Sequence, residues 1–100
     1  MPAKKHKPIH PGEVLKHDFM VPLGVTGYRL AKEIGVTAQH IGHVLRGTRN
    51  IGADLALRLA RYFGTSAELW ANLQAKYNLD IAEDRVGKEI ARRVKPHRAA

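Results

Sequence analysis

The chain has 100 residues, 44% of them hydrophobic, and contains no cysteine. A chain of this length buries enough apolar surface for one small domain with tails, and the lack of cysteine excludes disulfide and thiolate chemistry. The first residues lack the apolar stretch of a signal peptide, and no apolar run reaches the length of a membrane span. We therefore expect a cytoplasmic protein with no membrane partner.

Positive charge is concentrated at both ends of the chain. The formal net charge is +8, and the isoelectric point is about 10.2. Such a balance favours a polyanionic partner, most often a nucleic-acid backbone, although solvated basic ends without a binding role would give the same charge. The basic residues at the ends are Lys4, Lys5 and Lys7, then Arg85, Lys88, Arg92, Arg93, Lys95 and Arg98.

The first nine residues have no hydrophobic periodicity, which predicts a flexible leader. Pro11 then opens a helix, since its fixed φ angle suits a first helical position, and Glu13 lies where the positive end of the helix dipole favours a carboxylate. Pro22 and Gly24 are expected to end this helix. Its buried stripe is expected to contain Leu15, Phe19 and either Met20 or Leu23.

Residues 26–49 carry two short helical patterns joined by a tight corner. Gly35 can end the first helix in a left-handed conformation, and Thr37 can cap the second. Thr26 can cap the first, where unpaired amides and the helix dipole attract a phosphate. This is the sequence form of a helix-turn-helix. The apolar positions follow the i, i+3, i+4 spacing of amphipathic helices, with Leu30, Ala31 and Ile34 in the first helix and Ile41, Val44 and Leu45 in the second.

The second helix of this pair turns Gln39, Gly42, His43 and Arg46 away from its apolar side. Glutamine can pair with an adenine edge, arginine with guanine or a phosphate, and histidine can donate to an acceptor in the major groove. Glycine inside a helix costs about 1 kcal/mol relative to alanine. Gly42 therefore either allows close approach to a sugar-phosphate backbone, which we favour, or is a tolerated weakness. Arg49, in the polar loop that follows, is placed to contact phosphate.

A further helix is expected over about residues 53–63, with Arg58 and Arg61 solvated and Gly64 at its end. Thr65 to Glu68 form a capping box that starts the next helix. Trp70 on that helix is interpreted as a core residue, with a subunit interface as the alternative.

The helical pattern weakens after Asn78. Residues 81–94 have the spacing of a marginal helix that Gly87 interrupts, and residues 96–100 are expected to fray. The predicted organisation is a flexible basic leader over residues 1–9, a helix-turn-helix DNA-binding domain over residues 10–78 and a basic, partly helical C-terminal extension over residues 79–100.

Several segments match a known family over about residues 9–80. They resemble the Xre and lambdoid-repressor type of helix-turn-helix, and more specifically its HigA branch, also called VapI. The general positions are Leu30-Ala31, Gly35-Val36-Thr37, Ile41, Leu45-Arg46-Gly47 and Ala56 to Ala60, and the specific ones are His10 to Leu15, Ala56 to Gly64, Trp70 to Gln74 and Tyr77.

The resemblance implies an all-α, five-helix, lambda-repressor-like fold and the antitoxin of a type II toxin-antitoxin system. Such antitoxins neutralise a HigB toxin, a ribonuclease of the RelE type, and repress their own operon as homodimers on double-stranded operator DNA. Gly52 departs from the family, because relatives often have Thr or Ser as this helix cap. From the family positions and the residue chemistry together, the expected DNA-binding residues are Thr26, Gly27, Tyr28, Thr37, Ala38, Gln39, His40, Gly42, His43, Arg46 and Arg49.

Other functions fit the sequence less well. His40 and His43 share a helix face, but without cysteine or a convergent carboxylate pair we expect no metal and no other cofactor. Ser66 is the only serine and lies in a capping box, so no nucleophile or base is assigned and we do not expect an enzyme. Two alternatives stay open: a stand-alone helix-turn-helix regulator without a toxin, and salt-sensitive RNA or acidic-surface binding through the tails.

Overall fold

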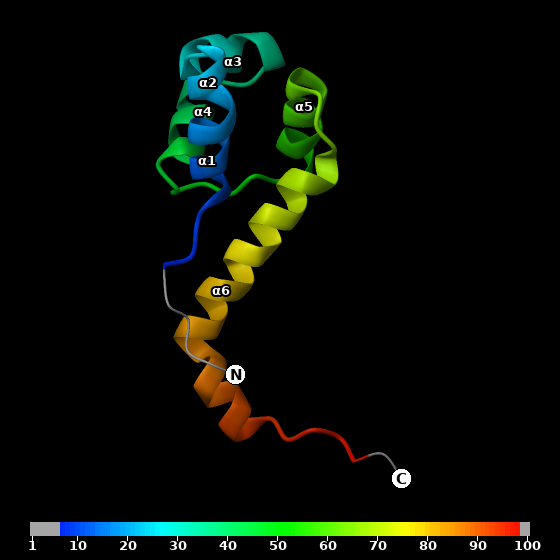
Figure 1. Ribbon diagram of the computed structural model, residues 1–100. Coiled ribbons are helices and arrows are strands. Elements are labelled where there is room, and N and C mark those ends of the chain that lie inside the picture. Colours follow the sequence, from blue (N-terminus) through cyan, green and yellow to red (C-terminus); the bar gives the residue numbers. More distant parts are fainter. Residues whose placement is uncertain (1–6, 99–100) are drawn as a thin grey trace.

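The computed structural model describes residues 7–98, and this part of the chain is helical with short connections. Most of the predicted leader, including Lys4 and Lys5, lies outside the described residues, as do the last two residues of the tail that was expected to fray. Figure 1 shows the helices that precede residue 64 gathered in one body, from which a long C-terminal helix runs away.

The first helical segment is continuous but changes its winding. It consists of α1 (Pro11–Val14), a π-helical stretch (Leu15–Met20) and α2 (Val21–Leu23). In the π-helical stretch the hydrogen bonds reach five residues back, as from the Val21 N–H to the Lys16 carbonyl. Pro22 therefore lies inside the last turn and does not itself end the helix; Gly24 does, in the left-handed conformation with φ 67°.

The core is formed where this segment meets α3 (Gly27–Ile34), α4 (Ala38–Leu45) and α5 (Ala53–Phe63). Met20 completes the stripe of the first segment, while Leu23 is 63% exposed. Burial of these apolar side chains is the main source of stability for a domain this small. The buried apolar residues are Leu15, Met20, Leu30, Ala31, Ile34, Ile41, Val44, Ile51, Leu55, Ala56, Leu59 and Trp70.

Trp70 is a core residue of the single chain, with no exposed surface. Its ring lies 5.0 Å from that of Phe19, which in turn lies 5.3 Å from that of Phe63. The indole Nε1 donates to the Thr65 hydroxyl at 2.8 Å, so the polar end of the tryptophan is satisfied. The subunit-interface alternative for this residue is wrong.

The C-terminal helix α6 (Ala67–Arg93) differs from expectation at both ends. Ser66 is its N-cap and accepts from the Leu69 N–H, so the expected box from Thr65 to Glu68 is wrong because Thr65 accepts from the indole. The helix also continues without a break past Asn78 and Gly87. Ion pairs one turn apart, Lys76 with Asp80 at 3.2 Å and Glu89 with Arg93 at 3.3 Å, support it there. Within residues 7–98, no helix has the length and apolar character required to span a bilayer.

Candidate nucleic-acid interface

The turn between α3 and α4 forms as the sequence predicts. Gly35 ends α3 in the left-handed region with φ 79°, a conformation that costs glycine little. The Thr37 hydroxyl accepts from the His40 N–H at 3.0 Å and thereby caps α4. Because the apolar sides of both helices are buried in the core, the opposite side of α4 faces solvent as a rigid surface.

The start of α4 carries the side-chain amide of Gln39, which is free to bind a partner outside the protein. Thr37, Ala38 and Gln39 are exposed, whereas His40 is partly buried. No hydrogen bond within residues 7–98 holds the Gln39 side chain. Its amide can therefore offer one donor and one acceptor together, which is the pattern that an adenine edge requires in the major groove.

His43 lies one turn further along and is held by its neighbours. Its Nδ1 atom lies 3.3 Å from Arg46 Nη2 and 3.2 Å from the Thr48 hydroxyl. A guanidinium nitrogen can only donate, so Nδ1 accepts and the neutral ring carries its proton on Nε2. The Nε2–H group remains as a donor for an acceptor on a base edge.

Gly42 makes room for Arg46 on this surface. A Cβ atom added at Gly42 would lie 3.3 Å from Arg46 Nη1, because the guanidinium folds back along the helix over the glycine. A side chain at Gly42 would require the guanidinium to move, while the close approach of a sugar-phosphate backbone to Gly42 stays a prediction. The contact of Arg46 Nη2 with His43 Nδ1 holds the guanidinium on this side of α4.

His40 is partly buried at the start of α4. Burial, followed by the positive charge of Arg49, lowers the pKa of His40, while Asp54 acts in the opposite direction. The ring therefore stays neutral at neutral pH. It therefore adds no positive charge to that of Arg46 and Arg49.

The N-terminus of α3 provides a second group of donors. The Thr26 hydroxyl accepts from the Arg29 N–H at 3.1 Å, which satisfies only one of the free amides of the first turn. The Gly27 and Tyr28 amides remain, and the Tyr28 side chain is 72% exposed. Amides at a helix N-terminus favour an anion, so this end of α3 suits a phosphate.

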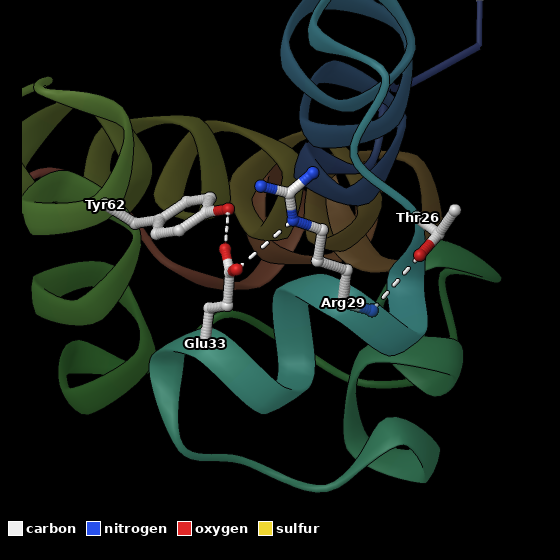
Figure 2. A network of polar contacts seen from close by, with 4 residues as sticks. All are labelled: Thr26, Arg29, Glu33 and Tyr62. Carbon is white, nitrogen blue, oxygen red and sulfur yellow. Dashed lines mark hydrogen bonds and ion pairs between the residues drawn. The ribbon is translucent and has the colours of Figure 1, made fainter.

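A polar network fixes α3 against α5, as Figure 2 shows. The Tyr62 hydroxyl on α5 donates to Glu33, and Arg29 Nε donates to the same carboxylate at 3.2 Å. The Tyr62 hydroxyl, followed by Arg29, holds the pKa of Glu33 below its usual range, while Glu33 raises the pKa of Tyr62. The network thus fixes the position of α3 relative to α5.

Arg58 adds a second tie between the same helices. Its side chain is 42% exposed, as expected for a solvated arginine, but it is also bonded to the protein, which was not expected. Its Nη1 atom donates to the Ile34 carbonyl at 2.6 Å, and its Nε atom donates to Asp54 at 2.6 Å. Arg58 therefore satisfies a free carbonyl at the C-terminal end of α3. Arg61 is likewise exposed, as expected.

The loop that carries Arg49 is attached to α6. The Ile51 N–H donates to the buried Gln74 side chain at 2.6 Å, and Gln74 in turn donates to Asn78 at 3.0 Å. The loop is therefore bonded to a helix distant in sequence, and Arg49 extends from it into solvent. Sequence reasoning missed Gln74 because a glutamine within an amphipathic helix usually faces water.

His10 is a second residue whose structural role sequence reasoning missed, because it was noticed only as the first residue of a family-specific segment. It is 4% exposed, and its Nδ1 atom accepts from the Gly12 N–H at 2.9 Å as the N-cap of α1. Its ring lies 4.9 Å from that of Tyr77 on α6 and packs on Gly47. Burial lowers the pKa of His10, while the Arg49 backbone carbonyl acts to raise it.

Gly12 lets α1 approach α4 closely. A Cβ atom at this position would lie 2.0 Å from the Val44 carbonyl oxygen, a distance that no side chain can tolerate. The segment from His10 to Gly12 therefore links α1, the end of α4 and α6. The residues of this segment are therefore required for the packing beneath the candidate interface.

Comparison with known proteins agrees with this geometry. A helix-turn-helix family model matches residues 18–70. Virulence-associated protein I of Dichelobacter nodosus is 44% identical over 85 residues, which cover 83% of this chain and 79% of that protein. Antitoxin HigA-1 of Vibrio cholerae is 33% identical over 96 residues, which cover 96% of this chain and 90% of that protein.

A solved structure of Pseudomonas aeruginosa antitoxin HigA with the higBA promoter is similar at a TM-score of 0.88 and 41% identity. The match covers 90% of this chain and 98% of that one. The likeness therefore extends beyond the helix-turn-helix and includes most of α6.

Proposed function

We propose, on the premise that this chain belongs to the HigA family of helix-turn-helix proteins, that it is an operator-binding repressor and the antitoxin of a type II toxin-antitoxin module. The DNA-binding proposal rests on the Gln39 side-chain amide, which is exposed at the start of α4 and forms no hydrogen bond within the described residues. Groups that can bind phosphate lie on both sides of it: the free amides at the start of α3, and Arg46 and Arg49 at and after the end of α4. The protein acts in the cytoplasm, where its operator lies.

In this mechanism α4 enters the major groove and reads base edges. Gln39 forms a bidentate pair with adenine, and the Nε2–H group of His43 donates to a base acceptor. Phosphates on either side of the groove are bound by the Gly27 and Tyr28 amides and by Arg49. Two copies place their recognition helices in successive major grooves, about 34 Å apart, on a palindromic operator.

The partner in the antitoxin role is a HigB-like ribonuclease toxin. Support comes from the Vibrio cholerae relative, which is an antitoxin and is matched over 90% of its length. No residue of this chain is given a catalytic role.

The DNA-binding proposal is tested by comparing Gln39→Ala with Arg49→Ala on a set of operator variants. Gln39→Ala should reduce discrimination at one or two base positions by about 1 to 3 kcal/mol, because only a base contact is lost. Arg49→Ala should weaken binding to all sequences alike and reduce the salt slope by about one unit, because a phosphate contact is lost.

Both substitutions remove exposed side chains, so both variants should remain folded, and circular dichroism checks this. Equal weakening of every sequence by Gln39→Ala would contradict the base-reading role of α4.

A further inference from the structure

One ring nitrogen of His43 faces two groups that favour opposite states of the ring. Arg46 Nη2 lies 3.3 Å from Nδ1, and the Thr48 hydroxyl lies 3.2 Å from the same atom. The guanidinium has donors only, so it requires a bare Nδ1. A hydroxyl oxygen that accepts from Nδ1 requires the proton on that nitrogen instead. The two neighbours of Nδ1 therefore select different tautomers of the neutral ring.

Thr48 is held as an acceptor by the end of α4. Its hydroxyl donates to the His43 carbonyl at 3.1 Å, and its N–H donates to the same carbonyl at 2.9 Å. Because a hydroxyl has one hydrogen, the oxygen of Thr48 offers only its lone pairs to the ring. These bonds do not involve Arg46, so Thr48 keeps its position beside Nδ1 whether or not the arginine is present.

Arg46 holds the ring in the other state. Among residues 7–98, the His43 ring is the only hydrogen-bond partner of its guanidinium. The guanidinium lies over Gly42, where an added Cβ would be 3.3 Å from Nη1. A guanidinium has five N–H groups, and the contact with His43 uses one of them. The others can bind a phosphate while the contact with His43 is kept.

We propose that Arg46 is a specificity-determining residue that selects a base through the tautomer of His43. The hydrogen bond at one ring nitrogen of a histidine fixes which nitrogen carries the proton. With Arg46 on Nδ1, the proton is on Nε2, and His43 selects a base acceptor such as guanine O6 or thymine O4. This inference rests on the proposed function for the contact of His43 with a base, but not for the state of the ring.

Loss of Arg46 gives the ring to Thr48. One proton then leaves Nε2 and another binds Nδ1 by exchange with water, so the ring stays neutral and Nδ1–H donates to the Thr48 hydroxyl oxygen. The bare Nε2 is now an acceptor, and it selects a base amino group such as cytosine N4 or adenine N6. The same histidine thus reads the opposite hydrogen-bonding pattern.

A direct contact of Arg46 with guanine makes a different prediction. Such a contact disappears with the side chain, so its loss would abolish a preference at one position. Loss of control over the tautomer instead reverses a preference, because Nε2 changes from donor to acceptor. A reversal at the base that His43 reads therefore distinguishes the two roles of Arg46.

The state of the ring is tested in the free protein by NMR with 15N-labelled histidine, because protonated and bare ring nitrogens have well-separated 15N shifts. Spectra are recorded at about pH 8.5, where a histidine ring is neutral, and the His43 signals are those missing from His43→Ala. The wild-type chain should show Nε2–H, and Arg46→Met should show Nδ1–H. Arg49→Met is the matched control, because it removes an exposed arginine that does not bond to the ring, and it should keep Nε2–H.

Thr48→Val separates the two partners of Nδ1. Valine keeps the β-branched shape but lacks the acceptor. Thr48→Val alone should keep Nε2–H, because Arg46 still donates, and its addition to Arg46→Met should remove the preference for Nδ1–H. An Nε2–H ring in Arg46→Met, or an Nδ1–H ring in the wild-type chain, would overturn the proposal.

The effect on base selection is measured with operator variants changed one base pair at a time. The position that His43 reads is the one at which His43→Ala abolishes a preference. There the wild-type chain should favour a base acceptor about fivefold, as expected for one hydrogen bond, and Arg46→Met should favour an amino group by about the same factor. Arg49→Met should weaken binding to every variant and keep the preference of the wild-type chain.

The two measurements separate this inference from the proposed function. If the ring changes its tautomer as predicted but the chain binds no operator, the proposed function fails and the control of the ring by Arg46 stands. If the chain binds its operator and Arg46→Met keeps or merely loses the preference at the position that His43 reads, the selection of a base through the tautomer fails alone.

Discussion

At the scale of single residues, the buried His10 supports the candidate interface without being part of it. It caps α1 through Gly12, packs beneath Gly47 and meets the ring of Tyr77. Its Nε2 atom is buried and forms no hydrogen bond of standard geometry in the described part of the chain, although the Arg49 carbonyl acts on the ring. A positive charge on this buried ring would cost more free energy than the neutral ring does, so the stability of the fold depends on the protonation state of one histidine.

This dependence predicts a pH effect. Burial lowers the pKa of His10 below its ordinary value of 6.5, so below that value the unfolded chain binds a proton that the folded chain does not. The stabilising contribution is thus complete above about pH 6.5 and is lost as the pH falls towards the folded-state value. His40 contributes in the same direction. His10→Asn keeps a capping acceptor and should therefore show a smaller fall in unfolding free energy between about pH 7.5 and about pH 5.5.

Urea unfolding at several pH values measures this effect, and His17→Asn is the control, because His17 is exposed on the same helical segment. A pH dependence that is unchanged in His10→Asn would show that His10 does not carry the effect.

At the scale of helices, the sequence predicted the elements whose signals are local. The ends of α3 and α4 were predictable because Gly35 and Thr37 act through their own backbone neighbourhood. The inward side of each helix was predictable because apolar spacing follows the helical period. The exposed face of α4, which includes Gln39 and Arg46 of the candidate site, was predictable from the same helical period.

Contacts between distant segments could not be predicted in this way. Arg58 bonds to a carbonyl 24 residues away, and Gln74 accepts from an amide 23 residues away, and neither side chain differs in sequence from a solvated one. The continuity of α6 was missed for another reason. Gly87 lowers helix stability by about 1 kcal/mol relative to alanine. The flanking residues are good helix formers and include ion pairs such as Glu89 with Arg93, and their combined stabilisation of the helix exceeds the cost of one glycine.

A missing cap on α5 gives a prediction at this scale. Gly52 is the N-cap of α5 in an extended conformation, makes no side-chain cap and has open space where a Cβ would lie. Gly52→Ser should raise the free energy of unfolding by about 0.5 to 1 kcal/mol, because it adds a cap and restricts the unfolded chain.

The matched control for this substitution is Gly64→Ser. Gly64 also has open space, but its φ angle is +75°, so the same substitution there should destabilise by about 1 kcal/mol. Equal effects at the two glycines in denaturant unfolding would contradict the capping argument.

At the scale of the whole molecule, α6 joins the parts of the fold. It closes the core with Trp70, holds the Arg49 loop through Gln74, and supports His10 through Tyr77. Its distal half then leaves the body and exposes apolar side chains, among them Leu79, Val86 and Ile90. One helix thus connects the core, the Arg49 loop of the candidate interface and the buried His10.

The antitoxin role is the central claim at this scale, and one co-expression measurement tests it most directly. The chain is expressed with its neighbouring reading frame, purified through a tag, and analysed for a second protein. We predict that a small ribonuclease co-purifies, that it arrests growth when expressed alone, and that this chain restores growth. A chain that purifies as a lone dimer and still binds its promoter, beside a harmless neighbour, would contradict the account and identify an autonomous repressor.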